Sequence, residues 1–212
     1  WSSDVCSSDL MRDAENIRAV EQLGIDMMGF IFYPHSPRFV AQPPSYLPVH
    51  CKRVGVFVNA DTSYILNRQR EYQLDMIQLH GNETPQFCKQ LRESLPAQVE
   101  IMKMIAVSGA SDLAMTTPYE DVVKLFLLES RNPIYGGSGQ QFDWENLQAY
   151  QSAHPFILSG GIGPEDTERI LRLQHPLMQA IDLNSKFETS PATKDIARLK
   201  TFIETIHKTH KI

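Results

Sequence analysis

Two glycine-rich segments in the second half of the chain have the composition of an anion site. One is Ser159–Gly163, which follows an apolar run and precedes a proline, and the other is Gly136–Gly139. Glycines let backbone N–H groups approach an anion, and the positive end of a helix dipole favours a phosphate there. Turn formation would explain either segment alone, but the two together predict a phosphate site. Its candidate residues are Gly137, Ser138, Gly160, Gly161, Asn184 and Ser185.

Glu129 directly follows the apolar run Leu125–Leu128 and is the candidate general acid. A carboxyl at the end of a buried strand can have a raised pKa, which suits proton donation. A structural ion pair with Lys103 is the alternative. His80 is expected at the mouth of the site in a hydrogen bond, and both His80 and Asp182 are further candidates for substrate binding. No second histidine lies at ligand spacing, so no metal site is predicted.

Arg38 lies between Pro37 and Phe39, on a loop stiffened by proline. A guanidinium in this position suits bidentate binding of a carboxylate or a phosphate. An ordinary exposed arginine is the alternative, because most arginines are at least partly exposed.

Short apolar runs recur along the chain and predict the elements that position these residues. They begin near residues 27, 53, 76, 101, 125, 156 and 180. Runs this short and continuous are typical of parallel strands buried on both faces. Extending the spacing back by one interval predicts an eighth strand within residues 3–9. Eight strand–helix units in a single domain of this length predict an α/β fold, a (β/α)8 TIM barrel. A doubly wound open sheet is the alternative, although no GxGxxG follows the first strand.

Helix-start signals follow most of the predicted strands. Asp13 is expected to cap a first helix, and Thr84–Pro85, Gly163–Pro164 and Ser190–Pro191 are expected to begin later ones. The second unit is different, because prolines 43, 44 and 48 fall where its helix would lie. An irregular connection is predicted there.

The composition excludes several classes of protein. The chain has 212 residues, a formal net charge of -5 and a pI of about 5.8, so it lacks the basic surface that nucleic acid requires. Its three cysteines include no CxxC pair, which indicates neither a disulfide framework nor a zinc site and favours the cytoplasm. No apolar run approaches the ~20 residues that span a bilayer, so no membrane association is expected. The first ten residues lack the features of a signal peptide.

Seven segments in order resemble the phosphoribosylanthranilate isomerase family of tryptophan biosynthesis. They are MRDAENIRAV, GFIFYPHSPRFV, VGVFVN, IQLHGNE, GGSGQQFDW, LSGGI and IDLNSKFE. The resemblance implies a barrel enzyme without a cofactor, which acts on a phosphorylated small molecule, N-(5-phosphoribosyl)anthranilate, in an Amadori rearrangement. It also implies that Arg38 binds the anthranilate carboxylate and that the late glycine loops bind the phosphate. Whether the enzyme is a monomer or a homodimer is left open.

The chain departs from this family at both catalytic positions. The family's acid is an aspartate where this chain has Glu129, and its base is a first-strand cysteine where this chain has Asp9. Cys6 lies three residues earlier, on the opposite strand face, and is a poor substitute. Residues 1–10 are therefore expected to be an atypical segment in place of the native first strand, with the barrel domain over residues 11–212.

Two further functions remain open for the sequence. Another phosphosugar isomerase or synthase would share the late phosphate site but would not require Arg38 or the first-strand base. A barrel that binds a phosphorylated ligand with impaired catalysis would account for Asp9 and Glu129. For the chain as written, we expect folding close to the family barrel and much reduced turnover.

Overall fold

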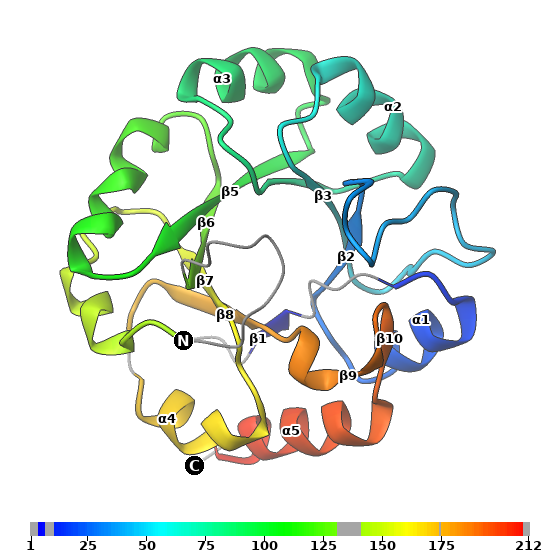
Figure 1. Ribbon diagram of the computed structural model, residues 1–212, viewed down its shortest axis with the longest axis vertical. Coiled ribbons are helices and arrows are strands. Elements are labelled where there is room, and N and C mark those ends of the chain that lie inside the picture. Colours follow the sequence, from blue (N-terminus) through cyan, green and yellow to red (C-terminus); the bar gives the residue numbers. More distant parts are fainter. Residues whose placement is uncertain (1–3, 7–10, 131–140, 174, 210–212) are drawn as a thin grey trace.

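The computed structural model describes residues 4–6, 11–130, 141–173 and 175–209, and it contains an eight-stranded parallel sheet. The order around the sheet is β1-β8-β7-β6-β5-β4-β3-β2, and β1 lies next to β2, which closes the ring (Figure 1). The strands are β1 (Asp4–Cys6), β2 (Met27–Ile31), β3 (Lys52–Phe57), β4 (Met76–Leu79), β5 (Glu100–Val107), β6 (Leu125–Ser130), β7 (Phe156–Ser159) and β8 (Met178–Asp182). The predicted barrel is confirmed, and β1 falls inside the predicted range. Asp9, Gly137 and Ser138 lie outside the described residues.

Helices cover the outside of the ring (Figure 1). They are the α-helices α1 (Ala14–Glu21), α2 (Thr62–Tyr72), α3 (Pro85–Ser94), α4 (Thr167–Arg172) and α5 (Ile196–Thr209), and the 3-10 helices η1 (Ala110–Tyr119), η2 (Trp144–Ala149), η3 (Pro164–Asp166) and η4 (Ser185–Phe187). The predicted caps are present: Asp13 accepts a hydrogen bond from the N–H of Asn16, and Thr84 accepts one from Phe87.

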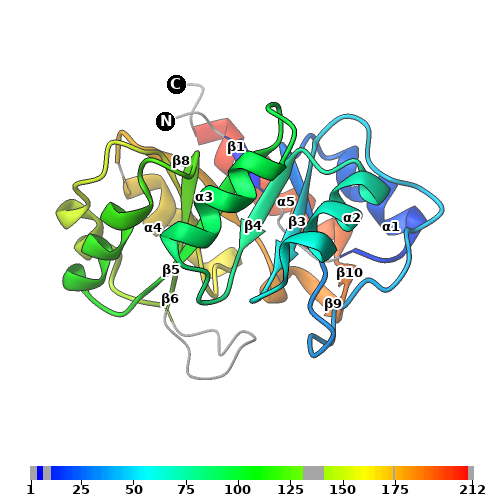
Figure 2. The same ribbon diagram turned by 90° about the horizontal axis from the view of Figure 1, so that it is seen from above.

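The last helix begins later than the sequence predicted. A helix start at Ser190–Pro191 is wrong, because this segment turns between β9 (Glu188–Ser190) and β10 (Thr193–Lys194), an antiparallel hairpin. Ala192 has a φ of +67°, which is incompatible with a right-handed helix. Asp195 accepts a hydrogen bond from the N–H of Arg198, so the helix starts after this cap. The hairpin lies at one end of the barrel beside α1 (Figure 2).

Two hydrophobic cores result from the alternation of side chains along the strands. One lies inside the ring and consists of Met27, Val54, Met76, Met102, Leu125, Leu127, Ile157 and Ala180. The other lies between the sheet and the helices, and it includes the fully buried Phe30, Ile77, Phe126 and Leu199. Filled interiors of this kind leave room for a ligand only at the ends of the barrel.

A buried carboxylate organises the connection between β2 and β3, which contains no helix, as predicted. Glu21 at the end of α1 accepts hydrogen bonds from the Tyr46 hydroxyl and from the N–H groups of Val49 and His50, the last at 2.6 Å. Burial raises the pKa of Glu21, but these hydrogen bonds outweigh burial and lower it below its ordinary value. The carboxylate thus replaces the backbone bonds that a helix would have supplied.

The lowered pKa of Glu21 predicts acid sensitivity. A depressed carboxyl pKa stabilises the fold above the unfolded-state pKa of about 4.3, and that stability is lost as the pH falls through the folded-state pKa. Glu21→Gln should lose about 1–3 kcal/mol at pH 7 and show a weaker dependence on pH between 3 and 5. Urea unfolding across that pH range measures both effects. Glu15→Gln, an exposed change in the same helix, is the control and should lose less than about 0.5 kcal/mol. Equal acid sensitivity of Glu21→Gln and the unmodified chain would contradict the account.

Candidate active site

Polar residues replace apolar ones inside the barrel at the carboxyl ends of the strands. In β4, Met76 belongs to the inner core, and Gln78 and His80 are two and four residues further on. The same two-residue step leads from Leu127 to Glu129 in β6. It also leads from the inner-core residues of β7 and β8 to Ser159 and Asp182. Because alternate residues of a strand share a face, these five polar side chains belong to the inner face. They form a polar layer at one end of the barrel.

His80 and Glu129 are in direct contact in this layer. The Nε2 atom of His80 lies 2.9 Å from Oε2 of Glu129, and the side chains are 23% and 27% exposed. On its other side, Nδ1 of His80 lies 2.8 Å from Nε2 of Gln78. Burial lowers the pKa of His80, but the charge and hydrogen bond of Glu129 outweigh burial and raise it above its ordinary value. The predicted hydrogen bond of His80 is present.

Lys103 does not pair with Glu129, so that alternative is wrong. Lys103 occupies the outer face of β5, where its Nζ donates to the carbonyls of Leu79 and Gly81 and to the carboxylate of Glu83, at 3.1, 2.7 and 3.1 Å. Both members of this ion pair are almost completely buried. Glu83 also accepts hydrogen bonds from backbone N–H groups at Asn59 and Gly81. The pair therefore fixes the loop that carries His80.

Arg38 lies on the loop after β2 and forms a forked ion pair with Glu188. Its Nε and Nη2 atoms donate to the Glu188 carboxylate at 2.9 and 2.6 Å. The Nζ atom of Lys194 lies 4.0 Å from Oε1 of Glu188, and it also donates to the carbonyl of Leu183 at 3.0 Å. The Glu188 side chain is 5% exposed, and Arg38 is 15% exposed. Arg38 is therefore held rigidly and is not an ordinary surface arginine.

The loop after β7 adopts a conformation that requires glycine. Gly160 and Gly161 have φ angles of +99° and +68°. A Cβ atom on Gly160 would lie 2.8 Å from the backbone nitrogen of Ser130, at the end of β6. The N–H of Gly163 donates to Asp166 at 2.8 Å and closes the turn into η3. The loop that follows β7 is thus packed directly against the end of β6.

Gln141, which follows β6 in the chain, contacts the loop after β7, and it was not singled out in the sequence. Its Nε2 donates to the carbonyl of Gly161 at 3.0 Å and to the carboxylate of Asp166 at 2.6 Å. Its Oε1 accepts from Arg169 at 2.7 Å. The side chain therefore fixes both the carbonyl of a predicted phosphate-binding glycine and the start of η3.

Of two further predicted residues, Asn184 lies between β8 and η4, and Ser185 is the first residue of η4. The side-chain Oδ1 of Asn184 is buried, and among the described residues it has no hydrogen-bond partner. Lys186 in the same segment pairs with Glu165 at 3.2 Å, which connects the loop after β8 to the loop after β7. Asp182 accepts a hydrogen bond from the Ser159 hydroxyl at 2.8 Å. Gln141, η3 and η4 are thus connected at the end of the barrel that carries the polar layer.

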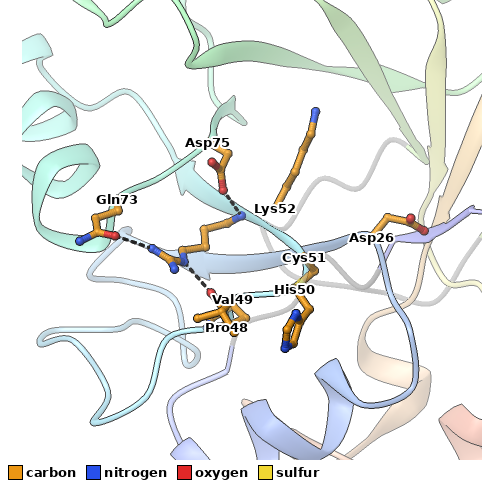
Figure 3. Close-up of a pocket in the computed structure, with 9 residues that line it drawn as sticks. Asp26, Pro48, Val49, His50, Cys51, Lys52, Gln73 and Asp75 are labelled. Carbon is orange, nitrogen blue, oxygen red and sulfur yellow. Dashed lines mark hydrogen bonds between the residues drawn. The ribbon is translucent and has the colours of Figure 1, made fainter.

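The opposite end of the barrel carries a polar hollow of about 530 Å³ (Figure 3). It is lined by residues at the amino ends of β3 and β4, among them His50, Cys51 and Asp75. Arg53 crosses it and donates to the carbonyl of Pro48 at 2.7 Å and to Gln73 at 3.0 Å. Burial raises the pKa of the Cys51 thiol to about 12, so this thiol is a poor nucleophile. These groups stabilise the base of the barrel, and the candidate site is the polar layer at the other end.

Comparison with known proteins identifies the family. A family described as N-(5'phosphoribosyl)anthranilate (PRA) isomerase matches residues 6–205. The N-(5'-phosphoribosyl)anthranilate isomerase of Phocaeicola vulgatus is 47% identical over 193 residues, which cover 91% of this chain and 93% of the relative. That of Parabacteroides distasonis is 43% identical over 202 residues, with 92% and 90% covered. The chain belongs to this family.

Solved structures of the isomerase family have the same fold. Phosphoribosyl anthranilate isomerase from Thermotoga maritima aligns with a TM-score of 0.79 at 31% identity, covering 93% of this chain and 96% of that one. An isomerase in complex with reduced 1-(o-carboxyphenylamino)-1-deoxyribulose 5-phosphate aligns with a TM-score of 0.75 at 28% identity, covering 93% and 95%. Another matching structure contains monomers generated from the dimeric Thermotoga maritima protein.

No helix in the described ranges has both the length and the apolar character needed to cross a membrane. Within the same ranges, no group of three or more His, Cys, Asp or Glu side chains is arranged to hold a metal ion.

The packing of Gly160 against Ser130 predicts that this position does not tolerate a side chain. Gly160→Ala should destabilise the protein by about 1–2 kcal/mol from its left-handed backbone, and by about 1–3 kcal/mol more from the steric conflict. Gly24→Ala is the matched control, because Gly24 has a φ of +76° but open space around it. Urea unfolding of both variants separates the two effects. Equal losses would show that contact with Ser130 imposes no constraint.

Proposed function

We propose that this chain catalyses the isomerisation of N-(5'-phosphoribosyl)anthranilate to 1-(o-carboxyphenylamino)-1-deoxyribulose 5-phosphate, a step of tryptophan biosynthesis. The observation that carries the proposal is the family match over residues 6–205, which includes the whole polar layer. We expect a monomer or a homodimer that acts in the cytoplasm on this phosphorylated small molecule, without a cofactor.

The two ends of this substrate are anions, and the site offers a suitable group for each. The segments after β7 and β8 are connected by the ion pair of Glu165 and Lys186, and we assign the phosphate to Gly137, Ser138, Gly160, Gly161, Asn184 and Ser185. We assign the carboxylate to Arg38. The forked pair with Glu188 fixes the position of the guanidinium. Asp182 completes the proposed contacts.

The reaction needs a proton donor and a base. We assign the donor to Glu129, whose partly exposed carboxyl faces the end of the barrel. It would protonate the furanose ring oxygen so that the ring opens to a Schiff base, after which a base takes the proton from C2. The family's cysteine base corresponds to Asp9, and we propose that residues 1–10 stand in place of the family's first strand, with the barrel domain over residues 11–212.

The missing base makes the proposal testable. Replacement of residues 7–10 by Lys-Val-Cys-Gly should raise turnover by about 10²–10⁴-fold, because general acid–base groups contribute this much. Loss of the fluorescence of phosphoribosylanthranilate measures the reaction. Replacement by Lys-Val-Ser-Gly, which differs only in the thiol, is the control and should give no such gain. Activity in neither chain, with binding of the reduced product retained, would support the impaired ligand-binding barrel instead.

Arg38 should act on binding more than on the chemical step. Arg38→Ala should raise the KM about 10–100-fold, as expected for loss of a charged hydrogen bond, with a smaller change in kcat. Steady-state kinetics gives both constants. Arg12→Ala, a change at an exposed residue, is the control, and thermal unfolding checks that both variants remain folded. An unchanged KM would remove the assignment of Arg38 to the carboxylate.

A further inference from the structure

Glu129 does not stand alone in the polar layer, because it is the outer member of a chain of three side chains. Gln78, His80 and Glu129 are connected by contacts of 2.8 and 2.9 Å that involve the two different nitrogens of the imidazole ring. The Nε2 group of a glutamine is only a donor, so Nδ1 of His80 accepts from it. The ring proton therefore lies on Nε2 and is directed at the Glu129 carboxylate.

The surroundings of His80 allow the ring to gain a second proton. Glu129 from β6 and Asp182 from β8 favour the imidazolium, whereas burial and Lys103 from β5 oppose it. The balance raises the pKa of His80 above its ordinary value. His80 is thus protonated in a larger fraction of molecules near neutral pH than an unperturbed histidine would be.

Gln78 can accommodate both charge states of the ring. Gln78 is 2% exposed, and its side-chain Oε1 is buried without a hydrogen-bond partner among the described residues. A half-turn of the amide about its last bond would direct this oxygen at Nδ1, where it could accept a proton from imidazolium. A buried amide oxygen without a partner is costly, and an apolar residue would pack this position at lower cost. Acceptance of the Nδ1 proton of His80 gives the oxygen a function.

We propose that His80 supplies the proton that Glu129 delivers to the substrate, and that Gln78 holds the ring for this transfer. The inference rests on the proposed function and deepens it. His80 acts through Glu129, and it is therefore a positioning residue that also carries the proton. This assignment differs from the direct substrate contact expected of His80 from the sequence.

The proton and electron changes are balanced. The Glu129 carboxylate takes the Nε2 proton of the His80 imidazolium, which leaves a neutral ring. The same proton then bonds to the furanose ring oxygen as the bond from C1 to that oxygen breaks, and the electron pair of that bond stays on the oxygen. The lone pair of the anthranilate nitrogen forms the C=N bond. The partly exposed ring regains a proton from water.

The first test measures His80 in the full chain without any need for turnover. Nitrogen-15 NMR of the imidazole should show a pKa above about 6.5, with the neutral ring protonated on Nε2. Glu129→Gln should lower this pKa, because it removes the charge but keeps a side chain of the same length. His50→Gln, an exposed change at the other end of the barrel, should leave it unchanged. A pKa of His80 that does not respond to Glu129→Gln would overturn the proposal.

The second test uses the dependence of kcat on pH, in the full chain and in the chain with Lys-Val-Cys-Gly at positions 7–10. His80→Gln retains a donor for Glu129 but carries no titratable proton. It should lower kcat at pH 8 by at least about 10-fold, change KM less than about 3-fold, and move the alkaline limb of the profile to lower pH. His50→Gln should change none of these quantities.

The outcomes of these tests distinguish failure of proton supply by His80 from failure of the proposed isomerase function. Turnover with an unchanged profile in His80→Gln would refute proton supply by His80 and leave the proposed function intact. A raised KM with an unchanged kcat would assign His80 to substrate binding and refute the inference. No turnover in either starting chain would overturn the proposed function, and with it this inference, even if His80 titrates as expected.

Discussion

The alternation of side chains along a strand is the constraint on which this site depends. Each strand of the closed ring directs every second residue inward, and the filled interior confines the candidate site to the inward positions at the ends of the strands. In β4, β6, β7 and β8 these last positions are polar. A reactive layer is therefore obtained without disturbing the apolar layer formed by Met76, Leu127 and Ile157 below it. The same constraint separates Lys103 from Glu129, since residue 103 occupies the outer face of its strand.

Buried charges in this molecule are compensated locally, and each compensated group fixes a loop. Lys103 and Glu83 fix the loop after β4, Glu21 fixes the irregular connection after β2, and Glu188 fixes Arg38. Isolated buried charges would be costly, but each of these groups has several hydrogen bonds. The loops that carry the candidate binding groups are thus held by side chains with few alternative partners, and such rigidity is what precise positioning of a small ligand requires.

Much of the fold followed from local patterns in the sequence. The strands, the caps at Asp13 and Thr84 and the irregular second connection are set by residues close together in the chain, so they could be predicted. The helix expected after Ser190–Pro191 failed because Pro at a first helical position is a weak signal where a hairpin and a better cap at Asp195 follow.

The partners of the site residues were harder to predict than their positions. Glu188 is 150 residues from Arg38, and no local pattern connects them. Gln141 was missed because an amide has no characteristic spacing. Gln78 is a polar residue at the end of a predicted strand, but its place two residues after Met76 does not reveal its contact with His80. The roles of the candidate residues in substrate binding and catalysis stay predictions.

The ion pair between Arg38 and Glu188 also has a consequence for the order in which the ring of strands closes. Asn16 and Lys194 exchange two further hydrogen bonds across 178 residues, so contacts from the first two units of the barrel reach the last. Such links are entropically expensive, because a long stretch of chain must be ordered before they can form. The intervening strands pair with near neighbours in sequence and have no such requirement. We expect the seam between the first and last units to be the last part of the barrel to assemble.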